Sequence, residues 1–516
     1  MVQKVESFVL GKWVAPGEGA RSIAHAITGE VIAEAGNDNL DFSGMVDFAK
    51  SKGGAALRAM SFHQRADMLK KLALYLNEHK EKLYEVSFAT GATAMDHMVD
   101  VDGGIGTLFV FASKGKKELP DSDILMDGDR EQFGKTGVFL GQHVYTSKPG
   151  VVVHINAFNF PVWGMLEKLA PSLLAGLPSV VKPATVSCYV TEACVRLMNQ
   201  SGVLPDGAVQ LVTGGLGNTL DLLNCQDMVT FTGSADTAMH LRSSGNLMRN
   251  GVPFSSEQDS LNASILGPDA VPGTPEFDLF VKEVTREMTV KAGQKCTAIR
   301  RILAPQDQVA PVIDALSARL GKTSVGDPRA EGVRMGALVS QEQRKDVLAK
   351  AEVISREAER VFGGQEGFSP VGADIEKGAF VAPTLFHCAE PDTATAVHET
   401  EAFGPISTIM GYRDLDHAIA LANRGQGSLV ASVITHDPEV ARTVVVGSGP
   451  YHGRLYFNDR ESMAESTGHG APMPHLVHGG PGRAGGGEEL GGIRGVKHFM
   501  QRTAVQGGPA ALDALA

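Results

Sequence analysis

Residues 151–213 read VVVHINAFNFPVWGMLEKLAPSLLAGLPSVVKPATVSCYVTEACVRLMNQSGVLPDGAVQLVT. Three short apolar runs in this segment have the length and the Val content of buried strands: 151–155, 179–182 and 209–213. The two longer stretches between them, 165–174 and 190–200, have the spacing of helices. Because strand and helix alternate, the segment predicts a doubly wound sheet of parallel strands, which binds ligands at the carboxyl ends of its strands.

The regions on either side predict further α/β structure. Beyond Asn262 a second series of elements begins, with helices expected at 277–291 and 309–320 and a strand at 301–303. This series predicts a second α/β domain. Before the quoted segment, apolar residues recur at helical spacing from Ser61 to Thr90, which predicts amphipathic helices.

Two other segments have a less regular pattern. Short β-rich runs at 138–140 and 144–146 predict a hairpin or ribbon that leads into the strand at 151–155. The stretch 468–487 is rich in Gly and Pro and has little periodicity. We therefore expect a long loop there, over a site or an interface.

The composition is that of a globular protein and argues against several partners. The chain has 516 residues, of which 43% are hydrophobic and 21% charged. Its net charge of -12 disfavours nucleic acid and anionic membranes, although it allows a local basic pocket. There is no signal-peptide core and no run of about 18 uncharged apolar residues. We therefore expect a cytoplasmic protein with no nucleic-acid or membrane partner.

The five cysteines are odd in number, scattered and without CxxC spacing, which indicates neither a disulfide framework nor a zinc site. No metal is therefore expected. One of them, Cys296, follows a Gly turn and stands beside lysines in KAGQKCT, residues 291–297. Most cysteines in a reducing compartment are inert small hydrophobes, so this segment alone does not identify a nucleophile.

Two further candidates also have ordinary structural explanations. Asn159 lies in NAFNFP, residues 156–161, just after the predicted strand at 151–155, where α/β sites form. An Asn at such a place is commonly a turn former. Glu257, in FSSEQD at 254–259, could serve in acid–base chemistry or lie in a solvated loop.

Taken together, these segments resemble the aldehyde dehydrogenase superfamily. Its ordered motifs are Asn-Phe-Pro, Lys-Pro-Ala, Phe-Thr-Gly-Ser, an isolated Glu, Gly-Gln-x-Cys and Glu-x-Phe-Gly-Pro. They are matched at 159–161, 182–184, 231–234, 257, 293–296 and 401–405. Six motifs in the right order along nearly the whole chain are not expected by chance. The resemblance implies an enzyme that oxidises an aldehyde to a carboxylic acid with a nicotinamide cofactor.

The resemblance also implies a role for each catalytic candidate. Cys296 would attack the aldehyde as a thiolate, and the side-chain amide of Asn159 with the Cys296 N–H would stabilise the oxyanion. Glu257 would take a proton from the water that hydrolyses the resulting thioester. Lys168 and Glu489 match positions that support proton movement or structure.

The cofactor positions follow from the same resemblance. Lys182 would bind the adenosine ribose, and Glu401 with Phe403 would hold the nicotinamide ribose. Gly233 and Ser234 would open a helix whose N-terminus faces the pyrophosphate, although Ser234 could equally be a plain N-cap. The full set of expected cofactor-binding residues is Ile155, Asn156, Lys182, Ala184, Thr185, Phe231, Gly233, Ser234, Glu401 and Phe403.

One position favours NADP over NAD as the cofactor. NAD-preferring relatives usually have a Glu three residues after the ribose-binding lysine, and here Thr185 stands in its place. A threonine neither repels a 2′-phosphate nor chelates two ribose hydroxyls. We therefore expect NADP, with NAD as a possible second cofactor.

The ending GGPGRAGGGEELGG at 479–492 departs from the usual family signature, as does Gln258-Asp259-Ser260 after the general-base Glu. This ending, together with residues 156–161, resembles a branch that acts on CoA-linked semialdehydes in aerobic aromatic degradation. Relatives of the phenylacetate pathway continue into a hydratase-like domain. The end at Ala516 therefore favours a stand-alone enzyme of benzoyl-CoA oxidation, acting on 3,4-dehydroadipyl-CoA semialdehyde, although a truncated bifunctional chain would end in the same way.

Two rival interpretations remain. A CoA-acylating dehydrogenase would resolve the thioester with CoA and generally lacks the general-base Glu, whereas Glu257 is present here. A catalytically silent homologue would need none of Cys296, Asn159 and Glu257.

The resemblance implies an α/β fold of the aldehyde dehydrogenase type. The ribbon near 137–153 and the tail at 493–506 suggest a dimer contact, so we expect a homodimer. We expect a Rossmann-type cofactor-binding domain formed by residues 1–130 and 151–262. A second α/β domain, 263–472, would be catalytic. A small β ribbon with a tail, 131–150 and 490–516, would serve oligomerisation.

Overall fold

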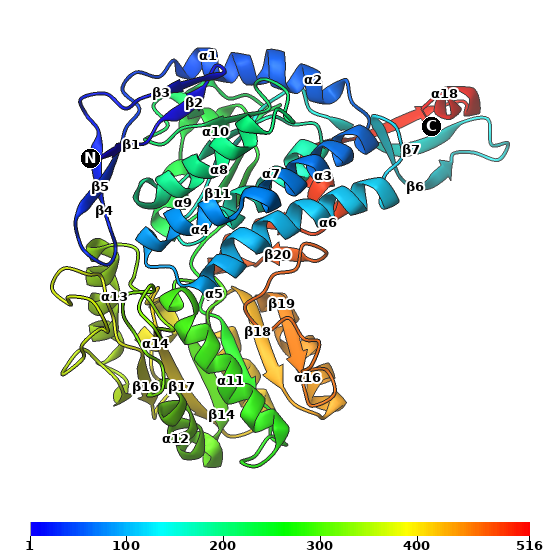
Figure 1. Ribbon diagram of the computed structural model, residues 1–516. Coiled ribbons are helices and arrows are strands. Elements are labelled where there is room, and N and C mark those ends of the chain that lie inside the picture. The colour runs from blue at the N-terminus through cyan, green and yellow to red at the C-terminus, as the bar shows by residue number, and fades with distance from the viewer. Residues whose placement is uncertain (1, 516) are drawn as a thin grey trace.

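The computed structural model describes residues 2–515 and is built around two seven-stranded sheets (Figure 1). Met1 and Ala516, at the ends of the expected domain ranges, lie outside the described residues. The first sheet has the strand order β12-β11-β8-β9-β10-β2-β3. Its strands are β2 (Ser7–Val9), β3 (Lys12–Val14), β8 (Val152–Ile155), β9 (Ser179–Lys182), β10 (Val209–Leu211), β11 (Met228–Thr232) and β12 (Phe254–Glu257).

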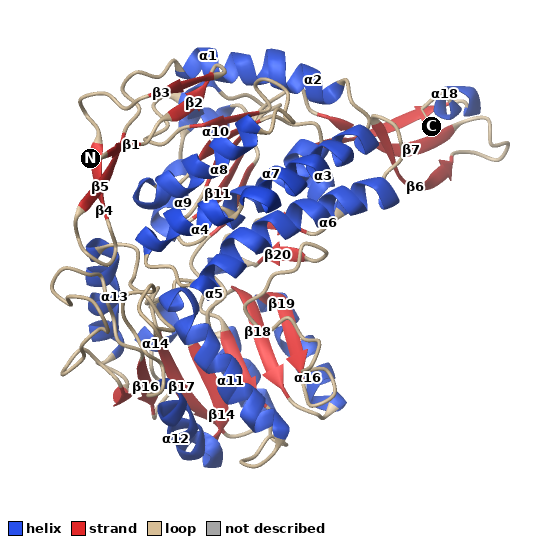
Figure 2. Ribbon diagram, viewed as in Figure 1, coloured by secondary structure: helices blue, strands red, loops and turns tan. Residues whose placement is uncertain are grey.

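The central strands of this sheet are parallel and end at one edge. Ile155 lies opposite both Lys182 and Phe231, and Thr232 lies opposite Glu257. These strands are buried along almost their whole length because helices cover both faces of the sheet (Figure 2). Val152 packs into the core on one face, whereas its neighbour Val153 packs into the core on the other.

Helices predicted from the sequence cover this sheet. The predicted helices at 165–174 and 190–200 are α7 (Trp163–Leu174) and α8 (Cys188–Gln200). The amphipathic stretch from Ser61 to Thr90 forms α3 (Phe62–His79) and α4 (Glu81–Ser87), and α3 begins with a capping box between Ser61 and Gln64. The long α6 (Gly103–Glu118) packs against both α3 and α7. Other helices of this half are α1 (Phe42–Phe48), α2 (Ala55–Arg58), α5 (Ala94–His97), α9 (Ala235–Arg242) and α10 (Gly245–Arg249).

The second sheet has the order β15-β16-β17-β14-β13-β18-β19, and only β15 runs antiparallel to its neighbour. Its strands are β13 (Ala263–Leu266), β14 (Arg301–Pro305), β15 (Glu359–Phe362), β16 (Thr384–Cys388), β17 (Ile406–Tyr412), β18 (Ser428–Ile434) and β19 (His452–Asn458). Its helices are α11 (Pro275–Thr289), α12 (Val309–Leu320), α13 (Gln341–Ile354), α14 (Ala396–Glu399), α15 (Leu415–Asn423) and α16 (Pro438–Ser448). The predicted α/β fold class with a second α/β unit is therefore confirmed.

A three-stranded antiparallel ribbon projects from the body of the molecule (Figure 1). It consists of β6 (Ile124–Gln132), β7 (Leu140–Ser147) and β22 (Met500–Gly507), and α17 (Ile493–His498) and α18 (Pro509–Asp513) flank the last strand. Of the predicted hairpin or ribbon, the structure forms the ribbon, which leads into β8. The runs at 138–140 and 144–146 are not the two arms of a hairpin, because β7 is one continuous strand. Gly141, which suggested a break, lies within the strand, where a Cβ would be 2.6 Å from the Phe133 ring.

The predicted loop at 468–487 is wrong in part. It contains β20 (Val477–Gly479), which pairs with β21 (Glu488–Leu490). The glycines are needed because backbones approach closely here: a Cβ on Gly453 of β19 would lie 1.6 Å from the Gly479 carbonyl oxygen. A third small sheet is formed by β1 (Gln3–Lys4), β4 (Arg21–Ala24) and β5 (Val31–Ala35). No helix within residues 2–515 is long and apolar enough to span a bilayer.

Candidate active site

Cys296 lies on a tight loop between α11 and β14. The helix predicted to reach residue 291 ends at Thr289, because Lys291 and Ala292 have the left-handed φ values of 54° and 51°. Such a backbone is costly for non-glycine residues and needs support. Asp96 supplies part of that support by accepting a hydrogen bond of 2.6 Å from the Lys291 N–H.

Several side chains hold the backbone of this loop. Arg300 is buried and donates hydrogen bonds to the carbonyl oxygens of Gly293, Lys295 and Gly404, at 2.9, 3.2 and 2.7 Å. The side-chain amide of Asn262 donates to the Cys296 carbonyl at 2.7 Å. Cys296 is therefore held rigidly.

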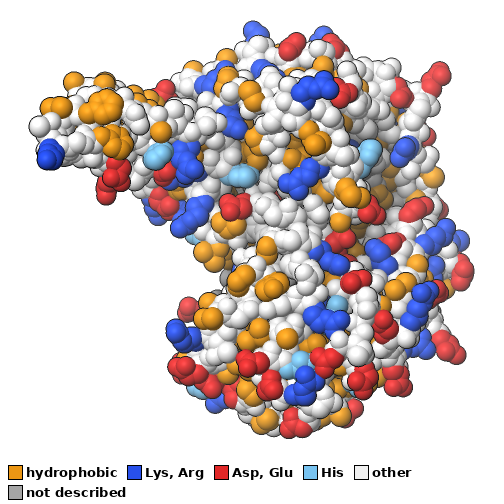
Figure 3. Space-filling model, turned by 180° about the vertical axis from the view of Figure 1, so that it is seen from behind, with side chains coloured by type: hydrophobic (Ala, Val, Ile, Leu, Met, Phe, Trp, Pro, Cys, Tyr) orange, Lys and Arg blue, Asp and Glu red, His pale blue; other side chains and the backbone are white. Residues whose placement is uncertain are grey.

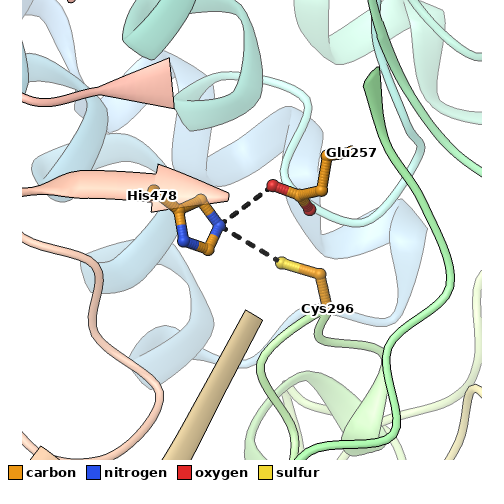
Figure 4. Close-up of side chains that lie close together, drawn as sticks. All are labelled: Glu257, Cys296 and His478. Carbon is orange, nitrogen blue, oxygen red and sulfur yellow. Dashed lines mark hydrogen bonds and ion pairs between the residues drawn. The ribbon is translucent and has the colours of Figure 1, made fainter. Parts of the chain in front are cut away.

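Glu257 is the last residue of β12, and its side chain is only 3% exposed. The alternative of a solvated loop residue is therefore wrong. Its Oε2 lies 3.0 Å from Nε2 of His478, and the same nitrogen lies 3.9 Å from Sγ of Cys296 (Figure 4). The three side chains come from β12, the loop before β14, and β20 (Figure 4).

The pKa values of Cys296 and Glu257 depend on each other and on burial. Burial raises the pKa of the Cys296 thiol well above its usual value, and the carboxylate of Glu257 raises it further. Burial would also raise the pKa of Glu257, but His478, Lys168 and the hydrogen bond from the Cys296 thiol outweigh burial and lower it. At neutral pH the resting pair is therefore a thiol next to a carboxylate.

A buried ion cluster adjoins this site. Lys168 on α7 lies 3.1 Å from a carboxylate oxygen of Glu489 on β21 and 3.1 Å from one of Glu167. Burial alone would lower the pKa of Lys168, but these carboxylates and Glu257 together raise it. Burial raises the pKa of Glu167 well above its usual range. Lys168 is thus a buried cation whose charge helps to keep Glu257 ionised.

Asn159 lies beside the loop of Cys296. Its side-chain amide donates to the Gln294 carbonyl at 3.1 Å. Within residues 2–515, the Cys296 N–H donates to no other group and remains available to an oxyanion. Asn159, Cys296 and Glu257 are therefore brought together, as the sequence predicted.

Cys296 lines two cavities. The larger, about 330 Å³, lies among mainly apolar side chains of α6, α7 and the segment 467–474, including Val110, Trp163 and Met473. The smaller, about 10 Å³, is lined by Cys296, Glu257 and Asn159 among others. A cavity of this size holds about one water molecule.

The expected cofactor-binding residues gather at the carboxyl edge of the first sheet and at the facing end of the second. Ile155, Lys182 and Phe231 are in strands β8, β9 and β11, and Asn156 follows β8. Ala184 and Thr185 begin the turn before α8, and Gly233 precedes Ser234, whose hydroxyl caps α9 at Thr237. Both polar side-chain atoms of the buried Asn156 lack a hydrogen-bond partner within residues 2–515. An orphaned amide at this edge fits a site that a polar ligand completes.

Glu401 and Phe403 lie on the side of the second sheet. One Glu401 oxygen accepts a hydrogen bond of 3.2 Å from the Ser260 N–H, and the other is 3.7 Å from Nε of Arg300 and has no hydrogen-bond partner within residues 2–515. Burial raises the pKa of Glu401 to about 7. The Phe403 ring packs edge-on against Phe158.

Sequence reasoning missed His478, Glu167 and Asn262. His478 lay within a segment that was expected to be a loop, and a lone histidine carries no spacing signal. Its neighbours Glu257 and Cys296 are 221 and 182 positions away in the chain, so only the fold brings the three together.

Comparisons with known proteins agree with this geometry. The aldehyde dehydrogenase family model matches residues 13–505. The chain is 45% identical, over 93% of each sequence, to 3,4-dehydroadipyl-CoA semialdehyde dehydrogenase of Aromatoleum evansii. It is 27% identical to geranial dehydrogenase of Castellaniella defragrans, over 95% of this chain and 97% of that one. A crystal structure of betaine aldehyde dehydrogenase from Staphylococcus aureus with NAD+ is similar with a TM-score of 0.82 and 23% identity, covering 98% of this chain and 95% of that one.

Proposed function

The chain belongs to the aldehyde dehydrogenase family and is an oxidoreductase that acts on aldehydes, and we propose that it oxidises a CoA-linked aliphatic semialdehyde, with NADP, through a thioester on Cys296. The resemblance and the relative from Aromatoleum evansii indicate 3,4-dehydroadipyl-CoA semialdehyde as the substrate. The product is the corresponding carboxylic acid.

One observation carries the proposed mechanism: Cys296 lies between a cavity of about 330 Å³ and one of about 10 Å³ that it shares with Glu257. The larger cavity has room for the acyl chain of an aldehyde beside the sulfur atom. The smaller has room for one water next to a carboxylate. The site can therefore serve both halves of a reaction that first acylates the cysteine and then hydrolyses the acyl-enzyme.

The first half requires Cys296 to lose its proton. Glu257 and His478 are the groups next to the thiol that can take it. The sulfur then attacks the aldehyde carbon, and the Cys296 N–H with the Asn159 amide stabilises the oxyanion of the thiohemiacetal. Asn159 is already turned toward this loop, where its amide donates to the Gln294 carbonyl.

A nicotinamide cofactor held at the carboxyl edge of the first sheet would supply the hydride acceptor for oxidation of the thiohemiacetal. The chain would hold this cofactor with the orphaned amide of Asn156, the amino end of α9 at Ser234, and the carboxylate of Glu401. Glu257 then takes a proton from water, and the hydroxide releases the acid. Lys168 would keep Glu257 ionised, and Glu489, which pairs with Lys168, would pass the proton of Glu257 onward.

The proposed preference for NADP depends on Thr185, at the start of the turn that follows β9. Replacing Thr185 by Glu would place a carboxylate where a 2′-phosphate is expected, next to Lys182. We expect the kcat/KM ratio of NADP to NAD to fall by at least about tenfold, a change of 1.4 kcal/mol. Steady-state kinetics with both cofactors measures it. Equal or better use of NAD by the unmodified enzyme would contradict the assignment.

The CoA-linked substrate rests on the relative at 45% identity and is compatible with the larger cavity. Its apolar walls suit an acyl chain, whereas the phosphates of CoA would have to remain outside. Arg286 lines this cavity, is exposed, and makes no ion pair within residues 2–515. It is our candidate for a contact with those phosphates.

The alternatives make different demands on Glu257. In a CoA-acylating enzyme free CoA takes the acyl group and no base for water is needed, whereas here Glu257 shares a water-sized cavity with Cys296. A dehydrogenase of the phenylacetate pathway would use the same chemistry on a different CoA-linked aldehyde. Comparing the two CoA-linked aldehydes, with and without free CoA, separates the three activities.

The decisive experiment measures the oxidation of free and CoA-linked aldehydes by three proteins: the unmodified enzyme and the variants Cys296→Ser and Glu257→Gln. Cys296→Ser should abolish cofactor reduction. Glu257→Gln should allow at most one burst of reduced cofactor per active site, because the acyl-enzyme forms but is not hydrolysed. Steady turnover by Glu257→Gln at the rate of the unmodified enzyme would remove Glu257 from its proposed role.

A further inference from the structure

Cys296, Glu257 and His478 offer a sulfur, a carboxylate oxygen and an imidazole nitrogen that all lie within 4.8 Å of one another (Figure 4). These are the three ligand types that Zn²⁺ prefers in proteins. The oxidation of aldehydes does not itself need three metal ligands around one point.

The distances are close to those of a zinc site. With Zn–S bonds of about 2.3 Å and Zn–N or Zn–O bonds of about 2.0 Å, the ligand atoms of a tetrahedral site are roughly 3.3–3.6 Å apart. Here Nε2 of His478 is 3.0 Å from Glu257 and 3.9 Å from Cys296. The third pair, Glu257 and Cys296, lies within 4.8 Å, so rotations of these side chains would have to close the remaining gap.

The surroundings favour a cation. The carboxyl groups of Glu257, Glu167 and Glu489 all disfavour a negative charge on the Cys296 sulfur. The buried cation that pairs with Glu167 and Glu489 is Lys168. A dication would allow the thiol to ionise next to these carboxyl groups. The adjoining cavity of about 10 Å³ has room for a water as a fourth ligand, as in zinc sites with three protein ligands.

We propose that Cys296, Glu257 and His478 form a reversible inhibitory site for Zn²⁺. On binding, the thiol loses its proton to solvent and the sulfur bonds to the metal, without any redox change. The inhibition, but not the binding, rests on the proposed function, because a zinc-bound thiolate cannot attack an aldehyde.

Cadmium is the probe for binding, since its bond to a thiolate has an ultraviolet charge-transfer band that does not depend on turnover. The full chain, freed of metal with a chelator, is titrated with Cd²⁺. We expect one tight site per chain, no band from that site in Cys296→Ser, and affinity weakened by more than about tenfold in His478→Phe and His478→Gln, since even outer-shell partners contribute that much. The exposed Cys225 provides the control, and Cys225→Ser should retain the site.

Zinc inhibition is measured in parallel. The rate of aldehyde oxidation should fall on addition of Zn²⁺ and recover with chelator, and Zn²⁺ should protect Cys296 from alkylation. A tight cadmium band that persists in Cys296→Ser would overturn the site. So would a cadmium affinity in both His478 variants equal to that of the unmodified protein, provided that thermal melting shows both variants to be folded. Cadmium binding does not require turnover. The titration can therefore disprove the metal site while the proposed function stands, and the kinetics can disprove the proposed function while the metal site stands.

Discussion

The neighbours of Glu257 have opposite effects on its proton. His478 and Lys168 favour the carboxylate, whereas an ionised Cys296 beside it would be a second negative charge in a buried place. The carboxylate and the thiolate are therefore not stable side by side without a proton or a cation. In the proposed mechanism, this coupling would let one carboxylate help to take the thiol proton in one half of the reaction and a water proton in the other.

Glu401 should make cofactor binding depend on pH. Burial raises the pKa of Glu401 to about 7, so the carboxyl is largely neutral below that pH and ionised above it. Ribose hydroxyls donate more strongly to a carboxylate than to a neutral carboxyl. If Glu401 holds the nicotinamide ribose, KM for the cofactor should fall several-fold, up to about tenfold, as pH rises through 7. Kinetics at several pH values measures this.

The control for that profile is Glu401→Gln, which cannot ionise. Above pH 7, the KM of this variant for the cofactor should be higher than that of the unmodified enzyme. Unlike that of the unmodified enzyme, it should not change as pH passes through 7. An unchanged profile in Glu401→Gln would show that another group is responsible.

At this scale the sequence identifies residues that belong to a motif and misses those that do not. Cys296, Asn159 and Glu257 were proposed from ordered motifs, and the structure places them around one cavity. His478 could not be found, since nothing local marks a histidine in a Gly-rich segment as facing a cysteine 182 positions away. Such a contact depends on β20 pairing with β21, a tertiary event.

Among the elements, α11 is anchored at its first turn by an ion pair. Arg460 donates to both oxygens of Glu276 from its side chain and to one from its backbone N–H. These hydrogen bonds lower the pKa of Glu276 from 4.5 to about 2. The amino end of the helix also favours a negative charge there.

Glu276→Gln should destabilise the protein by about 2 kcal/mol at neutral pH, a figure reduced from the full pKa shift because Arg460 is 44% exposed. Because the folded pKa is lowered, the stabilisation is present above pH 4.5 and is lost as pH falls toward 2. The difference in melting temperature between the two proteins should therefore narrow below pH 4.5. Thermal melting from pH 7 down to about pH 3 measures this narrowing.

Glu342→Gln is the matched control, since Glu342 is an exposed acid in the first turn of α13 and makes no ion pair within residues 2–515. Its cost should be about 0.5 kcal/mol. An equal loss in both variants would attribute the effect to the helix end rather than to Arg460.

The parallel strands were predicted well and the antiparallel pieces poorly, for a physical reason. A strand such as β9 is buried on both faces, so its apolar run marks its length directly. The strands of the ribbon have exposed faces and many polar residues, and β6 was not predicted at all. Its partner β7 contains Gly141, whose role is to fit under the Phe133 ring rather than to end a strand.

For the whole molecule, the projecting ribbon is the feature that suggests assembly. Its tip exposes Val138, Phe139 and Phe133, which are 68%, 46% and 45% accessible, and apolar side chains gather there in Figure 3. Apolar groups at the end of an arm gain by burial against another chain. We expect a homodimer that buries this tip.

The double substitution Val138→Asp and Phe139→Asp should shift the protein toward the monomer, because a buried carboxylate without a partner is costly. Size-exclusion chromatography with light scattering gives the mass. Met248→Asp, at a 73% exposed position on α10, is the control and should leave the assembly unchanged. An unaltered mass in the double variant would place the contact elsewhere.

The order of events at Cys296 is the central claim, and mass spectrometry of a trapped intermediate tests it most directly. Glu257→Gln is mixed with the aldehyde and NADP, quenched in acid and digested. The account predicts the acyl group of the substrate on the peptide that contains Cys296, in an amount equal to the burst of reduced cofactor. Reduced cofactor with no acyl group on that peptide, or with the group on another side chain, would contradict it.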